Sequence, residues 1–265
     1  MLFLRIFFIS NSRIHLIREH ALCYNQTMEL GKVYKKTNST SYALGASLTY
    51  ELLSSKVEYT RHVYFHPDFK KSEMYEEFVS LCVYNKVPYS ENEKIFRRLS
   101  DKEKCLVIGE FEKFVSPVNI CENHLVLHHI SNMGNLGTIL RTALGFHQKD
   151  IVIIKPACDI YDPKVIRASM GAFFHVNFSM YDSFEDYQKE IRDGREFYCF
   201  RLNASEDLRK TEKRDKYSLV FGNESSGLPA EFDSIGKGIK IPISEEIDSL
   251  SLPIAVSIGL YDFRE

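Results

Sequence analysis

Hydrophobic and polar residues in the first third of the chain alternate between helical spacing and short extended patterns. Leu44, Leu48 and Leu52 are spaced four residues apart, which predicts a helix. The sequence TRHVYFHP alternates like a short strand that a proline ends. Ser90, followed three residues later by Glu93, predicts the capped start of another helix. The predicted elements are a helix at residues 41–56, a strand at 60–67, a helix at 72–86, an extended segment at 87–89, a helix at 90–100 and a strand at 104–114.

Apolar strand patterns in the rest of the chain alternate with helical patterns. The predicted strands are HLVLHHI (124–130), DIVIIKP (150–156), REFYCFRL (195–202), YSLVFGN (217–223) and KGIKIPI (237–243). Nearly continuous apolar strands of this kind are typical of a parallel sheet that helices cover on both faces. The fold class is therefore predicted to be α/β, and ligands in such sheets gather at the carboxyl ends of the strands.

The chain length favours two compact units, because 265 residues exceed the ~100 to 200 residues of a usual domain. Residues 115–121 contain a proline and are the best candidate for a linker. We therefore predict a smaller α/β unit over residues 28–114 and a second unit over residues 115–265. Residues 1–27 are expected to be an unstructured extension or a misassigned start, since Met28 opens a segment that resembles an ordinary domain start.

Composition and charge describe an ordinary soluble protein. Hydrophobic residues make up 44% and charged residues 26%, and the net charge of −2 gives no global attraction to nucleic acid, so any RNA site must be local. The six cysteines are spread singly, which favours free thiols in a reducing cytoplasm over a zinc or redox motif. The apolar opening, interrupted by Arg5, is too short for a membrane anchor and offers no signal cleavage site.

Three loop segments follow predicted strands and should therefore lie at one edge of the sheet. They are NMGNLGTILRTA, LVFGNESSGLP and IPISEEIDSLSLP. In the first, an amphipathic helix turns Leu136, Ile139 and Leu140 toward the core and leaves Arg141 off the apolar stripe. Spacing alone also allows Arg141 to be a solvated surface arginine.

The second and third loops combine glycines with polar side chains. Gly222 permits close backbone approach to a ligand, and Gly227 can take a left-handed turn. Glu224 lies between them, where an isolated glutamate is more often a solvated turn carboxylate. In the third loop, Ser249 or Ser251 could instead cap a helix that begins near residue 252.

Several other chemistries are excluded by their missing motifs. The chain contains no G-x-G-x-x-G after a strand, no G-x-x-x-x-G-K-[ST] and no G-x-S-x-G, so NAD, ATP and hydrolase chemistry lack support. His128 and His129 lack a second cluster at metal-ligand spacing. We interpret them as loop or core residues and expect no metal.

Taken together, the three segments resemble the three motifs of the SpoU (TrmH-type) branch of the SPOUT methyltransferases, and the resemblance covers residues 122–263. Residues 161–176 resemble the connecting helix and strand of the family, and the first unit resembles its ribosomal-protein-like substrate-binding domain. The matching positions are Asn132, Asn135, Arg141 and Thr142, then Gly222, Asn223, Glu224, Gly227 and Leu228, then Ile241, Pro242, Ser249 and Leu250.

This resemblance implies a SPOUT domain with a deep trefoil knot, S-adenosylmethionine as cofactor, a homodimer and methylation of a ribose 2′-hydroxyl in RNA. The order of the domains favours ribosomal over transfer RNA. By the same resemblance, Arg141, Asn135, Glu224 and Ser249 are the candidate catalytic residues. The candidate cofactor-binding residues are Leu202, Asn203, Ala204, Gly222, Ile241, Leu250 and Ser251.

One departure from the family leaves an alternative open. Ser251 stands where the family usually has asparagine, and Pro253 stands where a serine is common. Serine has a shorter reach and lacks the paired donor and acceptor of the amide. A catalytically silent RNA- or ribosome-binding protein is therefore the alternative, and methylation of a base is a third hypothesis. Basic residues that could contact phosphate are Lys32, Lys35, Lys36, Lys94, Arg97 and Arg98, although each group could equally be a solvated face.

Overall fold

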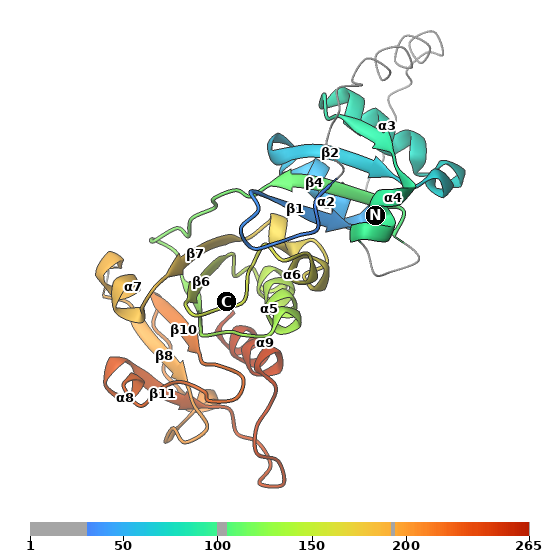
Figure 1. Cartoon of the computed structure of the whole chain (residues 1–265). Helices are drawn as coiled ribbons and strands as arrows, with labels where there is room; N and C mark the ends of the chain where they lie inside the picture. Colours follow the sequence, from blue (N-terminus) through green and yellow to red (C-terminus); the bar gives the residue numbers. More distant parts are fainter. Residues whose placement is uncertain (1–30, 100–104, 192–193, 265) are drawn as a thin grey trace.

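A computed structural model of the chain describes residues 31–99, 105–191 and 194–264. Its described part contains a four-stranded sheet, formed by residues before 113, and a seven-stranded sheet, formed by residues after 123 (Figure 1). The predicted N-terminal extension, residues 1–27, lies outside the described residues. None of the described helices is both long and apolar enough to cross a membrane.

The four-stranded sheet has the order β1-β4-β2-β3, with β4 antiparallel to β1 and β2, and β3 parallel to β2. Helices α2 and α3 and the apolar side chains of β2 build one core, and α4 packs with Tyr42 and Tyr64 on the other face. The strands are β1 (Thr40–Leu44), β2 (Thr60–Phe65), β3 (Tyr89–Glu91) and β4 (Val107–Glu112), and the helices are α2 (Ala46–Ser55), η1 (Val57–Tyr59), η2 (Pro67–Lys71), α3 (Tyr75–Tyr84) and α4 (Glu93–Leu99).

Two sequence predictions in this unit are wrong. The expected helix at 41–56 begins five residues late, because residues 40–44 pair with β4 and Gly45, at φ 119°, turns the chain before α2. Ser90 does not cap α4: it lies in β3, where its Oγ is 2.8 Å from Nε2 of His62, and the helix begins at Glu93. In both cases, strand pairing with distant residues overrides a local helical signal.

The seven-stranded sheet has the order β7-β6-β5-β10-β8-β11-β9, and all its pairings are parallel. Its strands are β5 (His124–His128), β6 (Asp150–Ile154), β7 (Asn177–Tyr181), β8 (Glu196–Phe200), β9 (Glu206–Asp207), β10 (Tyr217–Phe221) and β11 (Lys237–Lys240). All five strands that the sequence predicts here are confirmed. The connecting strand expected within residues 161–176 was placed too early, since those residues form helical segments and β7 starts at residue 177. The sequence missed β9, which is only two residues long.

Helices cover both faces of this sheet, as its apolar strands predict (Figure 1). Along β5, Leu125 and Leu127 join the core under α5, α6 and α9, whereas Val126 joins the core under α7 and α8. The helices are α5 (Met133–Gly145), α6 (Pro163–Ala168), η3 (Ala172–Phe174), α7 (Phe184–Glu190), η4 (Leu208–Lys210), α8 (Phe232–Ile235) and α9 (Leu252–Phe263). The trefoil knot stays a prediction.

The two sheets share one apolar core. Leu52 and Phe111 of the first unit pack in the same cluster as Phe173 and Phe174 of the second. The predicted linker follows the edge of the large sheet, where the backbone N–H of Val118 donates to Ser179 Oγ at 3.2 Å. The division of the chain near residue 114 stays a prediction, and the common core holds the units against each other.

Two buried histidines should make the stability of this fold depend on pH. Burial lowers the pKa of His62 to about 4, and burial together with the neighbouring His129 lowers the pKa of His128 to about 4. The unfolded imidazoles bind protons near pH 6.5, so protonation favours the unfolded chain below that pH. We expect the free energy of unfolding to fall as the pH drops from about 6.5 toward 4.

Denaturant titrations between about pH 7 and about pH 5 measure this loss, and a His62→Gln/His128→Gln double variant should show a flatter profile. An equally steep profile in the double variant would show that other groups cause the pH dependence.

Candidate active site

Loops that follow β5, β8, β10 and β11 meet at the carboxyl edge of the large sheet. The strands are parallel, so the structure confirms that the three loops singled out in the sequence lie on one edge. The loops after β8, β10 and β11 enclose a cavity of about 370 Å³. Its lining residues are Phe200, Arg201, Leu202, Asn203, Phe221, Gly222, Asn223, Glu224, Ser225, Ser226, Gly227, Leu228, Ile241, Ile243, Ser249, Leu250, Leu252 and Ala255.

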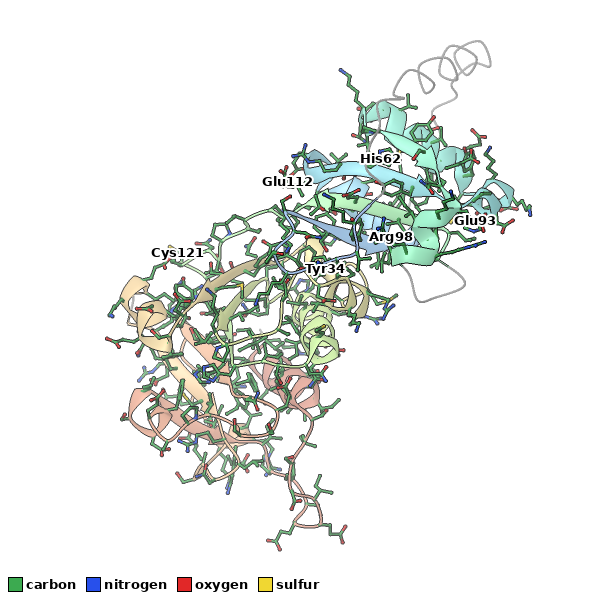
Figure 2. The ribbon with its side chains drawn as sticks, in the orientation of Figure 1. Tyr34, His62, Glu93, Arg98, Glu112 and Cys121 are labelled. Atoms are coloured by element: carbon green, nitrogen blue, oxygen red, sulfur yellow. The ribbon has the colours of Figure 1, made fainter. Side chains whose placement is uncertain are left out.

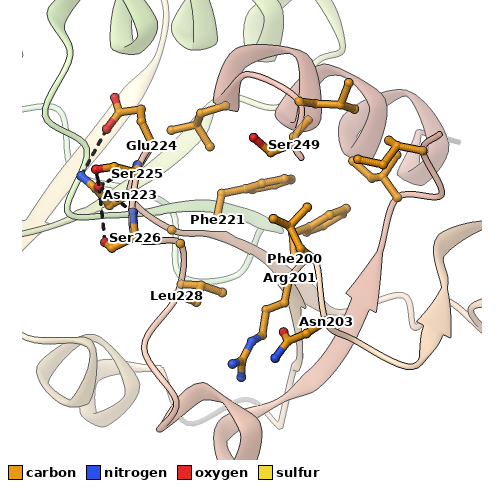
Figure 3. A pocket seen from close by; sticks show the side chains of 18 residues that line it. Phe200, Arg201, Asn203, Phe221, Asn223, Glu224, Ser225, Ser226, Leu228 and Ser249 are labelled. Atoms are coloured by element: carbon orange, nitrogen blue, oxygen red, sulfur yellow. Dashed lines mark hydrogen bonds between the residues drawn. The ribbon is translucent and has the colours of Figure 1, made fainter. Parts of the chain in front are cut away.

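Two stacked aromatic rings form an apolar wall of the cavity. The ring centroids of Phe200 and Phe221, the last residues of β8 and β10, are 4.1 Å apart, and their planes differ by 16°. Figure 3 shows residues 223–226 on one side of these rings, with Arg201 and Asn203 on another. The cavity thus combines an apolar wall with polar loop groups, which is typical of a small-molecule site.

Gly222 allows the loop after β10 to fold back on itself. A Cβ atom at this position would lie 2.1 Å from the carbonyl carbon of Gly227 and 2.3 Å from the amide nitrogen of Leu228. Gly227 has φ 66°, as expected for a left-handed turn. Gly222 is therefore required for packing within its own loop, and its close approach to a ligand stays a prediction.

Glu224 joins the loop after β10 to the loop after β5. Its Oε1 accepts hydrogen bonds from the backbone N–H of Asn132 at 3.1 Å and from Asn135 Nδ2 at 3.2 Å. Its Oε2 accepts from the Ser131 hydroxyl at 3.0 Å, from the Ser131 N–H at 3.3 Å and from Asn223 Nδ2 at 3.2 Å. The carboxylate therefore lies at the N-terminus of α5, where the helix dipole favours negative charge.

These hydrogen bonds also determine the charge of Glu224. Partial burial raises the pKa of its carboxyl group, but hydrogen bonds from the backbone of residues 224, 132 and 131 and from Asn135 outweigh burial. The pKa lies below its ordinary value of 4.5, so Glu224 is an anion at neutral pH. Such a carboxylate is a weak base and a strong hydrogen-bond acceptor, which suits it to holding neighbouring groups in place.

Arg141 lies outside this cavity. It is exposed on α5, six residues beyond Asn135, and makes no hydrogen bond or ion pair with any residue that the structure describes. Leu136, Ile139 and Leu140 are buried on the opposite side of the helix, as the sequence predicts. A single chain therefore brings together Asn135 and Glu224, but it leaves Arg141 at the surface.

Most of the other candidate residues line the cavity. Leu202, Asn203, Ile241, Ser249 and Leu250 do so, together with Gly222 and Glu224. Ala204 and Ser251 do not belong to the lining. Ser251 occupies the N-cap position of α9, but neither its side chain nor that of Ser249 makes the expected capping bond; the Ser251 carbonyl accepts from the N–H groups of residues 254 and 255.

Three lining residues were not among the candidates from the sequence: Phe200, Phe221 and Arg201. The Arg201 side chain is only 10% exposed, lines the cavity and donates to the exposed carboxylate of Asp233, which lies outside the lining. A charged residue directly after an apolar strand was a signal that could have identified Arg201. Buried His128 is a core residue, as expected, and within residues 31–99, 105–191 and 194–264 no group of three metal-ligating side chains occurs.

Comparison with known proteins decides the family. A model described as the SpoU rRNA Methylase family matches residues 122–261, which contain all three loops. The chain belongs to this family. Among SpoU relatives, the 23S rRNA (guanosine(2553)-2′-O)-methyltransferase RlmP of Bacillus subtilis is 24% identical over 53% of this chain and 57% of its own length. The match spans little more than half the length of the first curated relatives, at 57% and 52%.

Two solved structures resemble this chain, one over most of its length and one over about half. An AdoMet-bound rRNA methyltransferase from Sinorhizobium meliloti superimposes with a TM-score of 0.73 at 25% identity, covering 84% of this chain and 86% of its own. A structure described as giving insights into "the 2-OH methylation of C/U34 on tRNA" has a TM-score of 0.50 at 29% identity and covers 53% of this chain and 93% of its own. The α/β fold with a parallel sheet is that of SPOUT methyltransferase structures.

Proposed function

We propose that the protein transfers a methyl group from S-adenosylmethionine to a ribose 2′-hydroxyl in RNA, and that it acts in the cytoplasm. The observation that carries the proposal is the cavity at the sheet edge, which the second and third family loops line and to which Glu224 ties the first. A relative whose name specifies 2′-O-methylation and a neighbour that contains AdoMet support the same activity.

The cavity fits the proposed cofactor. Its volume of about 370 Å³ lies within the range of small-molecule pockets, and stacked aromatic rings beside loop backbone suit a purine nucleoside. We assign the contacts with S-adenosylmethionine to the backbone of five lining residues: Leu202, Asn203, Gly222, Ile241 and Leu250. Ala204 and Ser251, which lie outside the lining, would contact only the edge of the cofactor. S-adenosylmethionine, when bound, supplies an electrophilic methyl group on a sulfonium.

The residues of this chain then have to orient the ribose so that its 2′-oxygen faces the methyl group and its hydroxyl proton can leave. Glu224, as a fully hydrogen-bonded anion, positions Asn135, and Ser249 provides a further hydrogen bond near the cofactor. Arg141 places ribose and phosphate through its fork of donors; a neutral Arg141 acting as base would need strong help, since the pKa of arginine exceeds ~12. For methyl transfer, excluding water and aligning the ribose with the methyl group matter more at this site than additional charge.

We propose a homodimer in which Arg141 reaches the cavity of a second copy. Within one chain the arginine is exposed and outside the lining, so an active site that includes it requires a partner. The exposed side chains of Ile254 and Tyr261 on α9, which packs against α5, offer an apolar surface for that contact.

A more specific proposal concerns the class of RNA that the protein methylates. We favour ribosomal RNA, because the smaller α/β unit precedes the methyltransferase unit, and a ribosomal RNA enzyme matches most of the chain. Ribose-methylation maps of total RNA, with and without the protein, test this choice. A gain confined to transfer RNA would contradict it.

Calorimetric titration with S-adenosylmethionine tests the activity against the silent alternative, which the serine at position 251 motivates. A folded protein that shows no binding would refute the enzyme proposal. Digestion of methylated RNA and mass spectrometry then locate the methyl group, and a methyl on a base would contradict the ribose assignment.

Gly222→Ala should weaken cofactor binding by about tenfold or more, because the added methyl group forces residues 227 and 228 away from it. The dissociation constant measured by calorimetry tests this. Gly145→Ala is the control, since a Cβ there meets no atom within 4 Å, and it should bind like the wild type. Equal binding by both variants would contradict the assignment of this cavity.

A further inference from the structure

A second cavity lies between the two units. It has a volume of about 410 Å³ and contains two lysines, one from each side of the junction. Its lining residues are Lys36, Lys155, Pro156, Ala157, Met180 and Asp182. Figure 2 shows the adjoining Tyr34 at this junction. The cavity is distinct from the one proposed for the cofactor, because the two have no lining residue in common.

Lys113 fixes the segment that carries Lys36. Its Nζ donates to the backbone carbonyl of Lys36 at 2.8 Å and lies 4.9 Å from the ring centroid of Tyr34 and 5.3 Å from that of Tyr161. Asp159, beside Lys113 at 3.8 Å, accepts a hydrogen bond from the Tyr34 hydroxyl. The backbone at Lys36 is therefore held against the second unit, while the Lys36 side chain is exposed.

Lys155 follows directly after β6, at the same sheet edge as the proposed active site. β6 neighbours β5, and β5 neighbours β10, whose following loop contains Glu224. The nearest strands whose ends line the two cavities, β6 and β10, are thus two strand spacings apart, or roughly 10 Å. A nucleic-acid strand that enters the active site could contact both.

The chemistry of the second cavity suits a nucleotide. Two ammonium groups can contact a phosphate, while Pro156, Ala157 and Met180 offer an apolar wall. Asp182 forms an ion pair with Lys155 at 2.9 Å, and this pair is weak because the two side chains are 83% and 47% exposed. The negative charge of the Asp182 carboxylate repels phosphate. The second cavity therefore contains two lysines that attract phosphate and one carboxylate that repels it.

We propose that Lys36 and Lys155 bind the RNA backbone at a nucleotide flanking the methylated one, with Asp182 limiting affinity. This inference rests on the proposed function for its RNA ligand. It assigns substrate positioning jointly to the two units, through residues that none of the three family loops contains.

The test uses the full chain and a fluorescein-labelled single-stranded oligouridylate, with binding followed by fluorescence anisotropy. Lys36→Gln and Lys155→Gln should each weaken binding about threefold, and the slope of log affinity against log salt should become shallower by about 0.7 per lost contact. Asp182→Asn should strengthen binding about threefold, because it removes the repelling carboxylate.

Matched controls come from α7, where Lys189 lies 3.5 Å from Asp186 on an exposed surface. Lys189→Gln and Asp186→Asn carry the same charge changes and should leave affinity within experimental error. Equal effects of the control and cavity variants, no effect of the cavity variants, or no binding by the wild type at about 50 mM salt would each overturn the inference.

Titration of the same proteins with S-adenosylmethionine separates this inference from the proposed function. All these variants should bind the cofactor like the wild type, since the changed residues lie outside the first cavity. If the wild type does not bind S-adenosylmethionine, only the proposed function is refuted. If the cavity variants bind RNA like the wild type, only the RNA contact at the second cavity is refuted.

Discussion

Arg141→Ala should abolish methyl transfer, by about a thousandfold or more, while leaving the fold intact. The proposed role places this guanidinium at the ribose and phosphate of the substrate. Its exposed side chain makes no hydrogen bond or ion pair with any residue that the structure describes, so its removal should change the free energy of unfolding by less than about 0.5 kcal/mol. Single-turnover methylation and denaturant unfolding measure the two effects.

Arg214→Ala is the matched control for this experiment. Arg214 is also an exposed arginine of the second unit, but it precedes β10 and so lies at the opposite edge of the sheet from the cavity. Its removal should leave methylation unchanged. Arg141→Lys keeps the charge and loses the fork of donors, so residual turnover would favour positioning by charge. Full activity of Arg141→Ala would refute a catalytic role for this residue.

Glu224→Gln should reduce methyl transfer on the order of a hundredfold and also destabilise the protein. The two carboxylate oxygens accept hydrogen bonds from Ser131, Asn132, Asn135 and Asn223. Glutamine keeps the shape of the side chain but has only one accepting oxygen. Its amide NH₂ group replaces the other oxygen, so the N–H and O–H groups that donate to that oxygen lose their acceptor. We expect a loss of about 1 to 3 kcal/mol in unfolding free energy. Misplaced reacting groups then account for the rate loss.

Glu246→Gln provides the control, because Glu246 is an exposed carboxylate in the loop after β11 and does not line the cavity. It should match the wild type in stability and rate. If Glu224→Gln loses activity without losing stability, the carboxylate acts on the substrate directly. If it retains both, the hydrogen bonds seen around Glu224 have no role in positioning the site.

Local sequence patterns determined much of the second unit. Apolar runs marked all five central strands, and the three- and four-residue spacing of leucines and isoleucine marked the buried side of α5. Because carboxyl ends of parallel strands share one edge, the sequence also predicted that the three family loops meet. These features depend on neighbouring residues, which periodicity can detect.

Tertiary structure alone decided the features that depend on distant residues. Strand pairing turned residues 40–44 from an expected helix into β1, and β10 lies between β5 and β8 although all three are separate in sequence. Glu224 became an acceptor for residues about 90 positions earlier, and Lys113 holds Lys36 across 77 positions. Hydrogen bonds between residues so far apart in the sequence produce no periodic sequence pattern, because they depend on how the packed elements bring side chains together. The sequence already placed Arg141 off the apolar stripe, but only the tertiary structure shows that it lies outside the cavity, so the proposed site includes a second chain.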